Sequence, residues 1–396
     1  MIFNTPWFLA FFVAVYALLW TLRRPGARFA LVLAASAVFH AHFAGPAGVL
    51  PIIVMGVMVY FLAFRVAESQ GPARRRWLEL GLAVPVAGLV GYKYRVFLVT
   101  NLLALWPGGG AWLQALAQPS PMPLAISFFA FEFVHYLVDV YKGGEPIRKW
   151  HRFALFCIYF PSIVSGPIKR YEDFQAQLDQ GIPSPGRAPQ GAEGAAQLIT
   201  GFFKKLVLAD NLTVFIGLMD AQQGWGRWHV VLLMVLLSAR IVFDFSGYSD
   251  MAIGLSKLLG LRLPDNFNSP YLALDPSDFW RRWHMSLSSW IRDYIYIPLG
   301  GSRQGRLRKA ANGLAAMALC GLWHGAAWNF LVWGLYHGCG LAAHGSFASR
   351  FPAPSEPPWW RNALAWSACM VFVAYGWIWF FYPLSKAWNL SRLLFA

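Results

Sequence analysis

The sequence has little charge and very few acidic residues. Charged residues make up 13% of its 396 positions, against roughly 25% in soluble domains. The 18 Asp and Glu residues are outnumbered by 33 Lys and Arg residues. Hydrophobic residues make up 57% of the chain and aromatic residues 17%. This composition excludes an ordinary soluble enzyme and indicates an integral membrane protein.

Cysteine is also scarce, and metal-ligand spacings are missing from the sequence. The four cysteines lie in apolar runs without CxxC spacing, which predicts that they pack as small hydrophobic residues; they are Cys157, Cys320, Cys339 and Cys369. The chain has no HExxH motif, and His284 and His324 stand 40 positions apart, which is a weak zinc signature. We therefore expect no metal site.

The chain does contain a series of apolar stretches on the scale of membrane spans. A spanning helix needs about 20 mostly apolar residues. The stretches that approach this length are residues 7–20, 29–44, 49–64, 77–106, 124–141, 198–219, 230–245, 326–343 and 364–382. The shorter stretch 153–163 contains Pro161, which predicts a re-entrant or tilted half-helix covered by protein. The expected fold is an all-α polytopic integral membrane protein.

Basic residues are concentrated in alternate loops of this expected fold. Three arginines lie in residues 23–28 and four in residues 65–76, so both segments are predicted to face the cytoplasm. The loops 45–48 and 107–120 contain no charge, which predicts that they and the N-terminus lie outside. The basic segment 142–152 then falls inside as well. Beyond residue 153 the orientation stays open.

The net charge of +15 has two interpretations. Basic loops attract anionic lipid head groups, which accounts for part of the charge. The second interpretation is that some of the basic residues bind an anionic ligand, such as the phosphates of coenzyme A. Seven basic residues and one acid, Asp293, fall within 29 positions; the basic residues are Arg281, Arg282, Arg292, Arg303, Arg306, Arg308 and Lys309. Nucleic acid is an improbable partner for residues embedded in membrane-type sequence.

The segment from Asp244 to Arg303 holds the densest group of polar side chains. Ser246 and Gly247 are predicted to end a helix beside Asp244 and Asp250. This helix end either lines a polar cavity inside the membrane or lies at the membrane interface, with the two carboxylates paired to nearby arginines. A polar, proline-bounded loop follows at residues 263–271. Residues 278–298 then show helical spacing, with Ser277 or Asp278 as the cap and an apolar face of Trp280, Trp283, Leu287 and Trp290. His284, Ser288 and Arg281 fall on another face of this expected interfacial helix.

Two histidines stand out among nine. His324 lies in the apolar run Gly321-Leu-Trp-His-Gly-Ala-Ala-Trp328, where a polar group needs a functional reason. His284 lies in Arg281-Arg-Trp-His284. The other seven histidines are predicted to be packing residues. Asp250 and Arg281 are candidate supporters of the site, and Tyr248, Asn329 and Tyr336 are candidates for orienting an imidazole.

The segment from Phe279 to Gly301, followed by Trp323-His-Gly325, resembles the membrane-bound O-acyltransferase family (MBOAT). It is similar in particular to the bacterial branch that contains the alginate O-acetylation and D-alanyl teichoic acid export proteins. The resemblance extends upstream through Pro123-Leu-Ala-Ile-Ser-Phe-Phe129, Tyr136-Leu-Val-Asp-Val-Tyr141 and Phe160-Pro-Ser-Ile-Val-Ser-Gly-Pro-Ile-Lys-Arg170.

The resemblance implies a ring of about 10–12 transmembrane and re-entrant helices around a thinned central funnel. It implies one domain over residues 1–396, with N-terminal spans in 1–122, the family core in 123–345, and a C-terminal loop and span in 346–396. It also implies that His324 is the catalytic base and His284 a second catalytic or positioning residue. Candidate substrate-binding residues are Arg281, Arg282, Asp250, Ser288 and Asn329.

The implied reaction is O-acylation at the bacterial inner membrane. Acetyl-CoA or another acyl thioester would be a co-substrate, without a tightly bound cofactor. The acceptor would be an exported polysaccharide such as alginate or a cell-wall polymer. The implied partners are membrane lipids, the polysaccharide synthesis and export machinery, and a periplasmic acetyltransferase of the SGNH serine-hydrolase type.

The chemistry of imidazole is consistent with these roles. Acyl transfer from a thioester to a hydroxyl needs a base that removes the hydroxyl proton and then protonates the thiolate, and a group with a pKa of about 6.5 does both near neutrality. A non-catalytic transporter or channel subunit for a lipid-linked sugar or polymer is the alternative, in which the histidines and arginines bind without reacting.

The charge pattern predicts the outcome of cysteine labelling. Single cysteines at Gly48 and Gly110 should react with a membrane-impermeant maleimide in intact cells, and one at Ala73 only after permeabilisation. Labelling at Ala73 in intact cells would contradict the predicted orientation.

Overall fold

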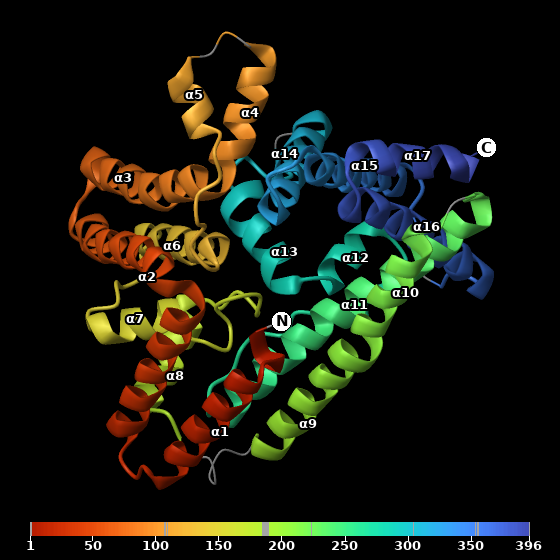
Figure 1. The fold of residues 1–396 in the computed structure, drawn as a ribbon. Helices are drawn as coiled ribbons and strands as arrows, with labels where there is room; N and C mark the ends of the chain where they lie inside the picture. The colour runs from red at the N-terminus through yellow and green to blue at the C-terminus, as the bar shows by residue number, and fades with distance from the viewer. Residues whose placement is uncertain are drawn as a thin grey trace. The chain divides into compact units, whose positions relative to one another are not determined.

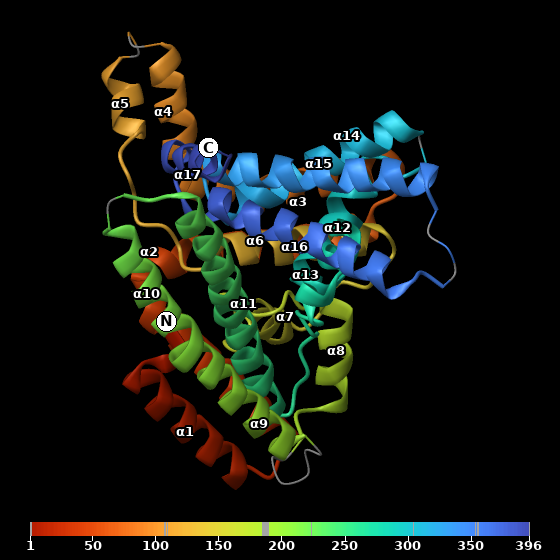
Figure 2. The same ribbon diagram turned by 90° about the vertical axis from the view of Figure 1, so that its right-hand side faces the viewer.

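The computed structural model describes residues 2–106, 108, 110–183, 190–222, 224–303, 305–352, 354 and 356–395, and its regular structure in these ranges is helical (Figures 1 and 2). Four helical segments are long and apolar enough to cross a membrane: Pro25–Glu68, Gly71–Leu105, Arg227–Leu258 and Trp359–Phe381. Pro6–Thr21 is a shorter apolar helix. The predicted all-α class is confirmed.

The described chain divides into two compact units. The first contains residues 1–199 and 249–264, and the second contains residues 200–248 and 265–396. Two helices contribute residues to both units, namely α9 (Gly191–Phe202) and α11 (Arg227–Leu258).

The first unit is built on α2, α3 and α6, which pack against one another (Figure 1). A π-helical turn, Val90–Tyr94, joins α3 to α4 within one long apolar segment. The remaining short helices surround this group. The helices of the unit are α1 (Pro6–Thr21), α2 (Pro25–Glu68), α3 (Gly71–Leu89), α4 (Arg95–Leu105), α5 (Ala111–Leu116), α6 (Ile126–Tyr141), α7 (Trp150–Ile158) and α8 (Tyr171–Gln180).

The predicted spans 29–44 and 49–64 both lie in α2, as two helical parts that meet at a kink at Gly45, whose φ of 64° and ψ of 174° are non-helical. The kink takes the place of the predicted loop at residues 45–48, and the orientation of the two parts in the membrane stays a prediction. Glycine is suited to this conformation because it has no Cβ, and Pro46 follows directly. Gly48 is buried in the helix, so the labelling experiment should rely on Gly110 and Ala73, which are exposed. It also needs Cys339 removed, because that thiol is exposed.

A buried ion pair lies within the first unit. The Glu132 carboxylate of α6 pairs with the Lys169 ammonium, and the two side chains are 8% and 2% exposed. The ammonium also lies 5.0 Å from the centre of the Phe156 ring. Desolvating two charges is costly unless their geometry is good, so loss of either partner would leave an uncompensated buried charge. Helix α7 ends at Ile158, before Pro161. The ion pair therefore fixes the segment that follows α7 against α6.

In the second unit, helices α14 and α15 run antiparallel and lie side by side (Figures 1 and 2). Short helices precede them and a long apolar helix follows. The helices of the unit, besides its shares of α9 and α11, are α10 (Asp210–Asp220), α12 (Pro276–Arg282), α13 (Met285–Ile291), α14 (Arg306–His324), α15 (Trp328–Arg350), α16 (Trp359–Phe381) and α17 (Leu384–Phe395).

Helix α11 runs without interruption past Ser246 and Gly247, so the predicted helix end at these residues is wrong. Gly247 serves packing instead. A Cβ placed there would lie 3.0 Å from the carbonyl oxygen of Gly201, so only glycine lets the two backbones approach this closely. Asp244 of the same helix pairs with Lys205 at 2.7 Å.

Glycine also sets the contact between α14 and α15. A methyl group at Gly321 would overlap the carbonyl oxygen of Phe330, and one at Gly334 would overlap the carbonyl oxygen of Met317. Both obstacles are backbone atoms, which cannot rotate away. The two helices therefore pack backbone to backbone, a contact typical of membrane helices with small residues at their interface.

Replacing Gly334 with Ala should lower the melting temperature of the detergent-solubilised protein, because the added methyl group forces α14 and α15 apart. Overpacking of this kind costs about 1–3 kcal/mol. The matched control is Gly217→Ala in α10, where a Cβ meets no atom within 4 Å. Equal melting temperatures for the two variants would show that the close approach does not contribute to stability.

Candidate active site

His284 lies at a break between α12 and α13. Its φ of 44° and ψ of 52° place it in the left-handed region, where non-glycine residues are uncommon. The prediction of one continuous interfacial helix over residues 278–298 is therefore wrong. The start also differs: Asp275 caps α12 by accepting a hydrogen bond from the Asp278 N–H at 2.8 Å, and Pro276 follows at the first helical position.

The loop after Pro264 holds this break in place. The Asn268 N–H donates to the Arg282 carbonyl at 2.9 Å, and the Met285 N–H donates to the Asn266 carbonyl at 2.9 Å. These two backbone bonds lie on either side of His284. A strained backbone persists only where its surroundings determine it, and this loop does so.

The His284 imidazole is completely buried. Its Nδ1 lies 3.0 Å from the Asn266 Oδ1, and the Phe245 ring of α11 stands edge-on to it at 4.6 Å. His284 lies outside the four apolar helices. Burial lowers the pKa of its imidazole well below the usual range, and the nearby His324 lowers it further. The ring is therefore neutral at physiological pH.

His324 is the last residue of α14 and is half-buried. Three aromatic rings stand nearly perpendicular to its imidazole, with centroids at 4.9 Å for Trp323, 5.2 Å for Trp333 and 5.1 Å for Phe380. The Trp323 indole also contacts His284, at 5.9 Å. The structure thus brings the two predicted histidines, 40 positions apart, to one indole.

Asn329 supports this arrangement from α15. Its Nδ2 donates to the carbonyls of Trp379 and Phe380, at 3.3 and 3.2 Å. It thereby holds the C-terminal turn of α16, which carries the Phe380 ring against His324. Tyr336 bonds to the Phe372 carbonyl at 2.9 Å, so its hydroxyl also fixes α16 and orients neither imidazole directly.

His337 is buried in an aromatic cluster, as expected for a packing residue. The Trp280 indole N–H donates to its Nδ1 at 3.4 Å, and the rings of Trp333 and Phe372 lie at 4.9 and 5.2 Å. This cluster joins α12, α15 and α16. It fixes the end of α12 shortly before the break at His284.

Three of the predicted supporting residues are engaged elsewhere. Arg281 and Arg282 both pair with Asp278, at 3.3 and 2.9 Å, and the Arg281 side chain is 67% exposed. Asp250 belongs to the first unit, where its Oδ1 accepts a hydrogen bond from Gln197 at 3.1 Å. The structure therefore gathers His284, His324 and Asn329, and it leaves the role of these other three as a prediction.

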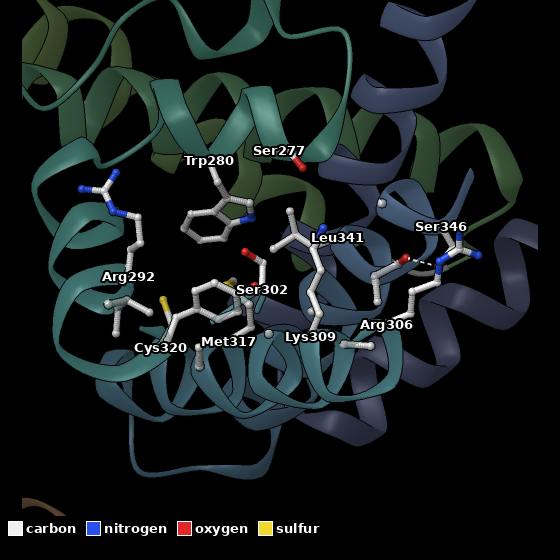
Figure 3. A pocket seen from close by; sticks show the side chains of 18 of the residues that line it. Ser277, Trp280, Arg292, Ser302, Arg306, Lys309, Met317, Cys320, Leu341 and Ser346 are labelled. Atoms are coloured by element: carbon white, nitrogen blue, oxygen red, sulfur yellow. Dashed lines mark hydrogen bonds between the residues drawn. The ribbon is translucent and has the colours of Figure 1, made fainter. Parts of the chain in front are cut away.

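A pocket of about 560 Å³ lies within the second unit (Figure 3). Three basic side chains line it, and the rest of its wall is mainly small or apolar. Figure 3 shows Arg292 and Arg306 on opposite sides, with Lys309 extending between them. Arg292 pairs with Asp293 at 2.8 Å, whereas Arg306 and Lys309 form no ion pair with any described residue.

Neither His284 nor His324 lines the pocket, but residues one helical turn from each of them do. Its lining includes Ser288, whose N–H donates to the His284 carbonyl at 2.9 Å. It also includes Cys320, which lies one helical turn before His324 on the same face of α14. Two of the three basic lining residues, Arg306 and Lys309, lie at the start of the same helix. Helix α14 therefore carries basic side chains of the pocket at one end and the half-buried His324 at the other.

Sequence reasoning missed two parts of this site. Arg306 and Lys309 were included in the basic cluster but were not distinguished from Arg281 and Arg282. Asn266 was noted only as part of a polar, proline-bounded loop. Its position between prolines in a polar loop was the one available signal.

The same unit thus holds two imidazoles at the Trp323 indole and a pocket lined by basic side chains, groups that suit acyl transfer from an anionic donor. The chain belongs to the membrane-bound O-acyltransferase family: the family model for MBOAT matches residues 123–386. The resemblance seen in the sequence is confirmed.

Several curated relatives extend over the whole chain. The probable alginate O-acetylase AlgI of Pseudomonas aeruginosa is 35% identical over 402 residues, which are 100% of this chain and 75% of that protein. The peptidoglycan O-acetyltransferase of Helicobacter pylori is 32% identical over 432 residues, covering 100% of this chain and 78% of that protein. The teichoic acid D-alanyltransferase of Bacillus subtilis is 31% identical over 233 residues, covering 57% and 59%.

These relatives decide between the two functions that the sequence left open. The chain is an O-acyltransferase of the MBOAT family, related to O-acetylases of different polymers, and the non-catalytic transporter alternative is not supported.

Proposed function

We propose that this enzyme takes acetyl groups from cytosolic acetyl-CoA and passes them across the bacterial inner membrane for O-acetylation of an exported polysaccharide or cell-wall polymer. The observation that carries the proposal is the pair of imidazoles at the indole of Trp323, next to a pocket with basic residues. The O-acetylase relatives support acetyl as the acyl group.

The proposed donor site is the pocket along α14. Arg306 and Lys309 would bind the phosphates of coenzyme A, since they form no ion pair with described residues. The apolar wall formed by Trp280, Met317 and Cys320 would hold the pantetheine arm. The thioester would then approach His324 from the last turn of α14.

The proposed transfer needs one base. His324 removes the proton from the acceptor hydroxyl as its oxygen attacks the thioester carbonyl carbon; the C–S bond breaks, and the imidazolium returns the proton to the departing thiolate. His324 is half-buried and keeps part of its surface exposed, which suits the base, whereas the completely buried His284 suits a positioning role.

The proposed cellular setting follows the charge pattern and the family. The N-terminus would lie on the periplasmic side, and the helices would surround a thinned funnel that admits donor and acceptor from opposite faces. A periplasmic acetyltransferase of the SGNH type would complete the transfer to the polymer. The kinship with the alginate O-acetylases supports this arrangement, while the kinship with a peptidoglycan enzyme keeps the acceptor class broader than alginate.

Replacing His324 with Ala should reduce acetyl transfer from radiolabelled acetyl-CoA by at least about 100-fold in proteoliposomes, because the general base is lost. Expression and membrane insertion should be unchanged. His284→Ala should have a smaller effect. The control is His229→Ala, since His229 is exposed. Near-normal transfer by the His324 variant would refute its assignment as the base.

Neutralising the pocket cations tests the donor site. The double variant Arg306→Gln, Lys309→Gln should raise the KM for acetyl-CoA at least about tenfold with little change in kcat, because phosphate contacts bind the ground and transition states alike. The matched variant Arg281→Gln, Arg282→Gln removes the same charge from the other two candidate substrate-binding arginines, which pair with Asp278. A KM within about twofold of wild type in this variant would assign the donor phosphates to Arg306 and Lys309 alone. The reverse result would move the donor phosphates to α12.

A further inference from the structure

Three hydrogen-bond contacts converge on one side-chain oxygen at the break before α13. The Oδ1 of Asn266 lies 2.8 Å from the Ser286 hydroxyl, 3.3 Å from the Ser286 N–H and 3.0 Å from the His284 Nδ1. All three residues are buried, with Asn266 1% exposed. None of these contacts belongs to the acyl-transfer step described above.

The Ser286 contact determines which nitrogen of His284 carries the proton. A backbone N–H can only donate, so the Asn266 atom that faces Ser286 is its carbonyl oxygen and not its amide nitrogen. That oxygen can only accept. The Nδ1 of His284 must then donate to it, and a neutral imidazole with its hydrogen on Nδ1 has its lone pair on Nε2.

The other nitrogen of the ring is left available. The His284 Nε2 is buried and has no hydrogen-bond partner among the described residues. In the opposite tautomer, a lone pair of the His284 Nδ1 would face a lone pair of the Asn266 Oδ1 at 3.0 Å, which is repulsive. It would therefore lose the only side-chain hydrogen bond that the structure shows for this imidazole.

We propose that Asn266 is a positioning residue that fixes His284 in the Nδ1–H tautomer, so that the Nε2 of this imidazole stays unprotonated as a buried hydrogen-bond acceptor beside His324. The link between this tautomer and catalysis rests on the proposed acyl transfer. The tautomer rests on the geometry alone. The same loop thus sets the backbone of His284 through the Asn266 carbonyl and its protonation through the Asn266 side chain.

Nitrogen NMR of the full chain in lipid nanodiscs tests the tautomer directly. Protein labelled with ¹⁵N-histidine should show a buried imidazole protonated at Nδ1, and this signal should disappear in His284→Asn, which keeps a residue that tolerates a left-handed backbone. Asn266→Leu should abolish the preference for Nδ1. A His284 signal protonated at Nε2 in the wild-type protein would overturn the proposal.

The pH profile of acetyl transfer provides a second readout. The residues facing His284 from other helices are Phe245 and Trp323, which carry no charge, and His324, which titrates. In Asn266→Asp, the converging donors favour the ionised carboxylate, and this charge favours the imidazolium. The pKa of His284 should therefore rise, and the acid limb of kcat/KM should move to higher pH by about 1 unit.

Two further variants separate positioning from folding. Ser286→Ala removes one donor but leaves the His284 contact, so the tautomer and the acid limb should stay as in wild type. Asn266→Leu should lower kcat at least about tenfold, as expected when a buried acceptor of a catalytic hydrogen bond is lost. In the His284→Asn background, Asn266→Asp should no longer move the acid limb.

The outcomes distinguish this proposal from the proposed function. If Asn266→Asp and Asn266→Leu lower activity equally, leave the acid limb in place and leave the NMR tautomer unchanged, Asn266 only holds the loop and the proposal is wrong. If His284 is protonated at Nδ1 but His324→Ala retains transfer, the tautomer assignment stands and the assigned base fails.

Discussion

The break between α12 and α13 is the constraint on which the site depends. His284 adopts a left-handed backbone that a histidine rarely takes, and two backbone hydrogen bonds from residues 266–268 hold it there. Without this break, residues 276–291 would continue as one helix. The imidazole would then lie on a face of that helix that points away from Trp323. The local strain is offset by the burial of His284, Asn266 and Ser286 in one hydrogen-bonded group.

The two units use polar groups inside apolar surroundings in different ways. In the first unit, Glu132 and Lys169 neutralise each other and fix the chain after α7, which is a structural use of charge. In the second unit, neutral imidazoles and amides take the corresponding place, and each has a defined partner or an aromatic enclosure. A neutral imidazole can take up a proton as an imidazolium and then give it back, so it suits a site where protons move.

The sequence predicted the class, the family and the two histidines because these depend on local composition and on long motifs. The apolar stretches correspond to α1, α2, the segment from α3 to α4, α6, the segment from α9 to α10, α11, α15 and α16. It did not predict the break at His284, because residues 278–291 have helical spacing and the break is imposed by Asn266, which lies far earlier in the chain. It also could not separate Arg281 from Arg306, since only packing decides which cation faces a pocket and which one faces Asp278.

Helix α14 connects two basic residues of the pocket to His324, the proposed base, through one rigid element. Arg306 is its first residue and His324 its last, so the two are separated by about 27 Å of helix at 1.5 Å per residue. The helix contains no proline that would let this length change. In the proposed function, a donor that engages both ends of α14 at once must have its anionic end and its acyl end comparably far apart. The length of this helix would then select the size of the carrier independently of the acyl group that it delivers.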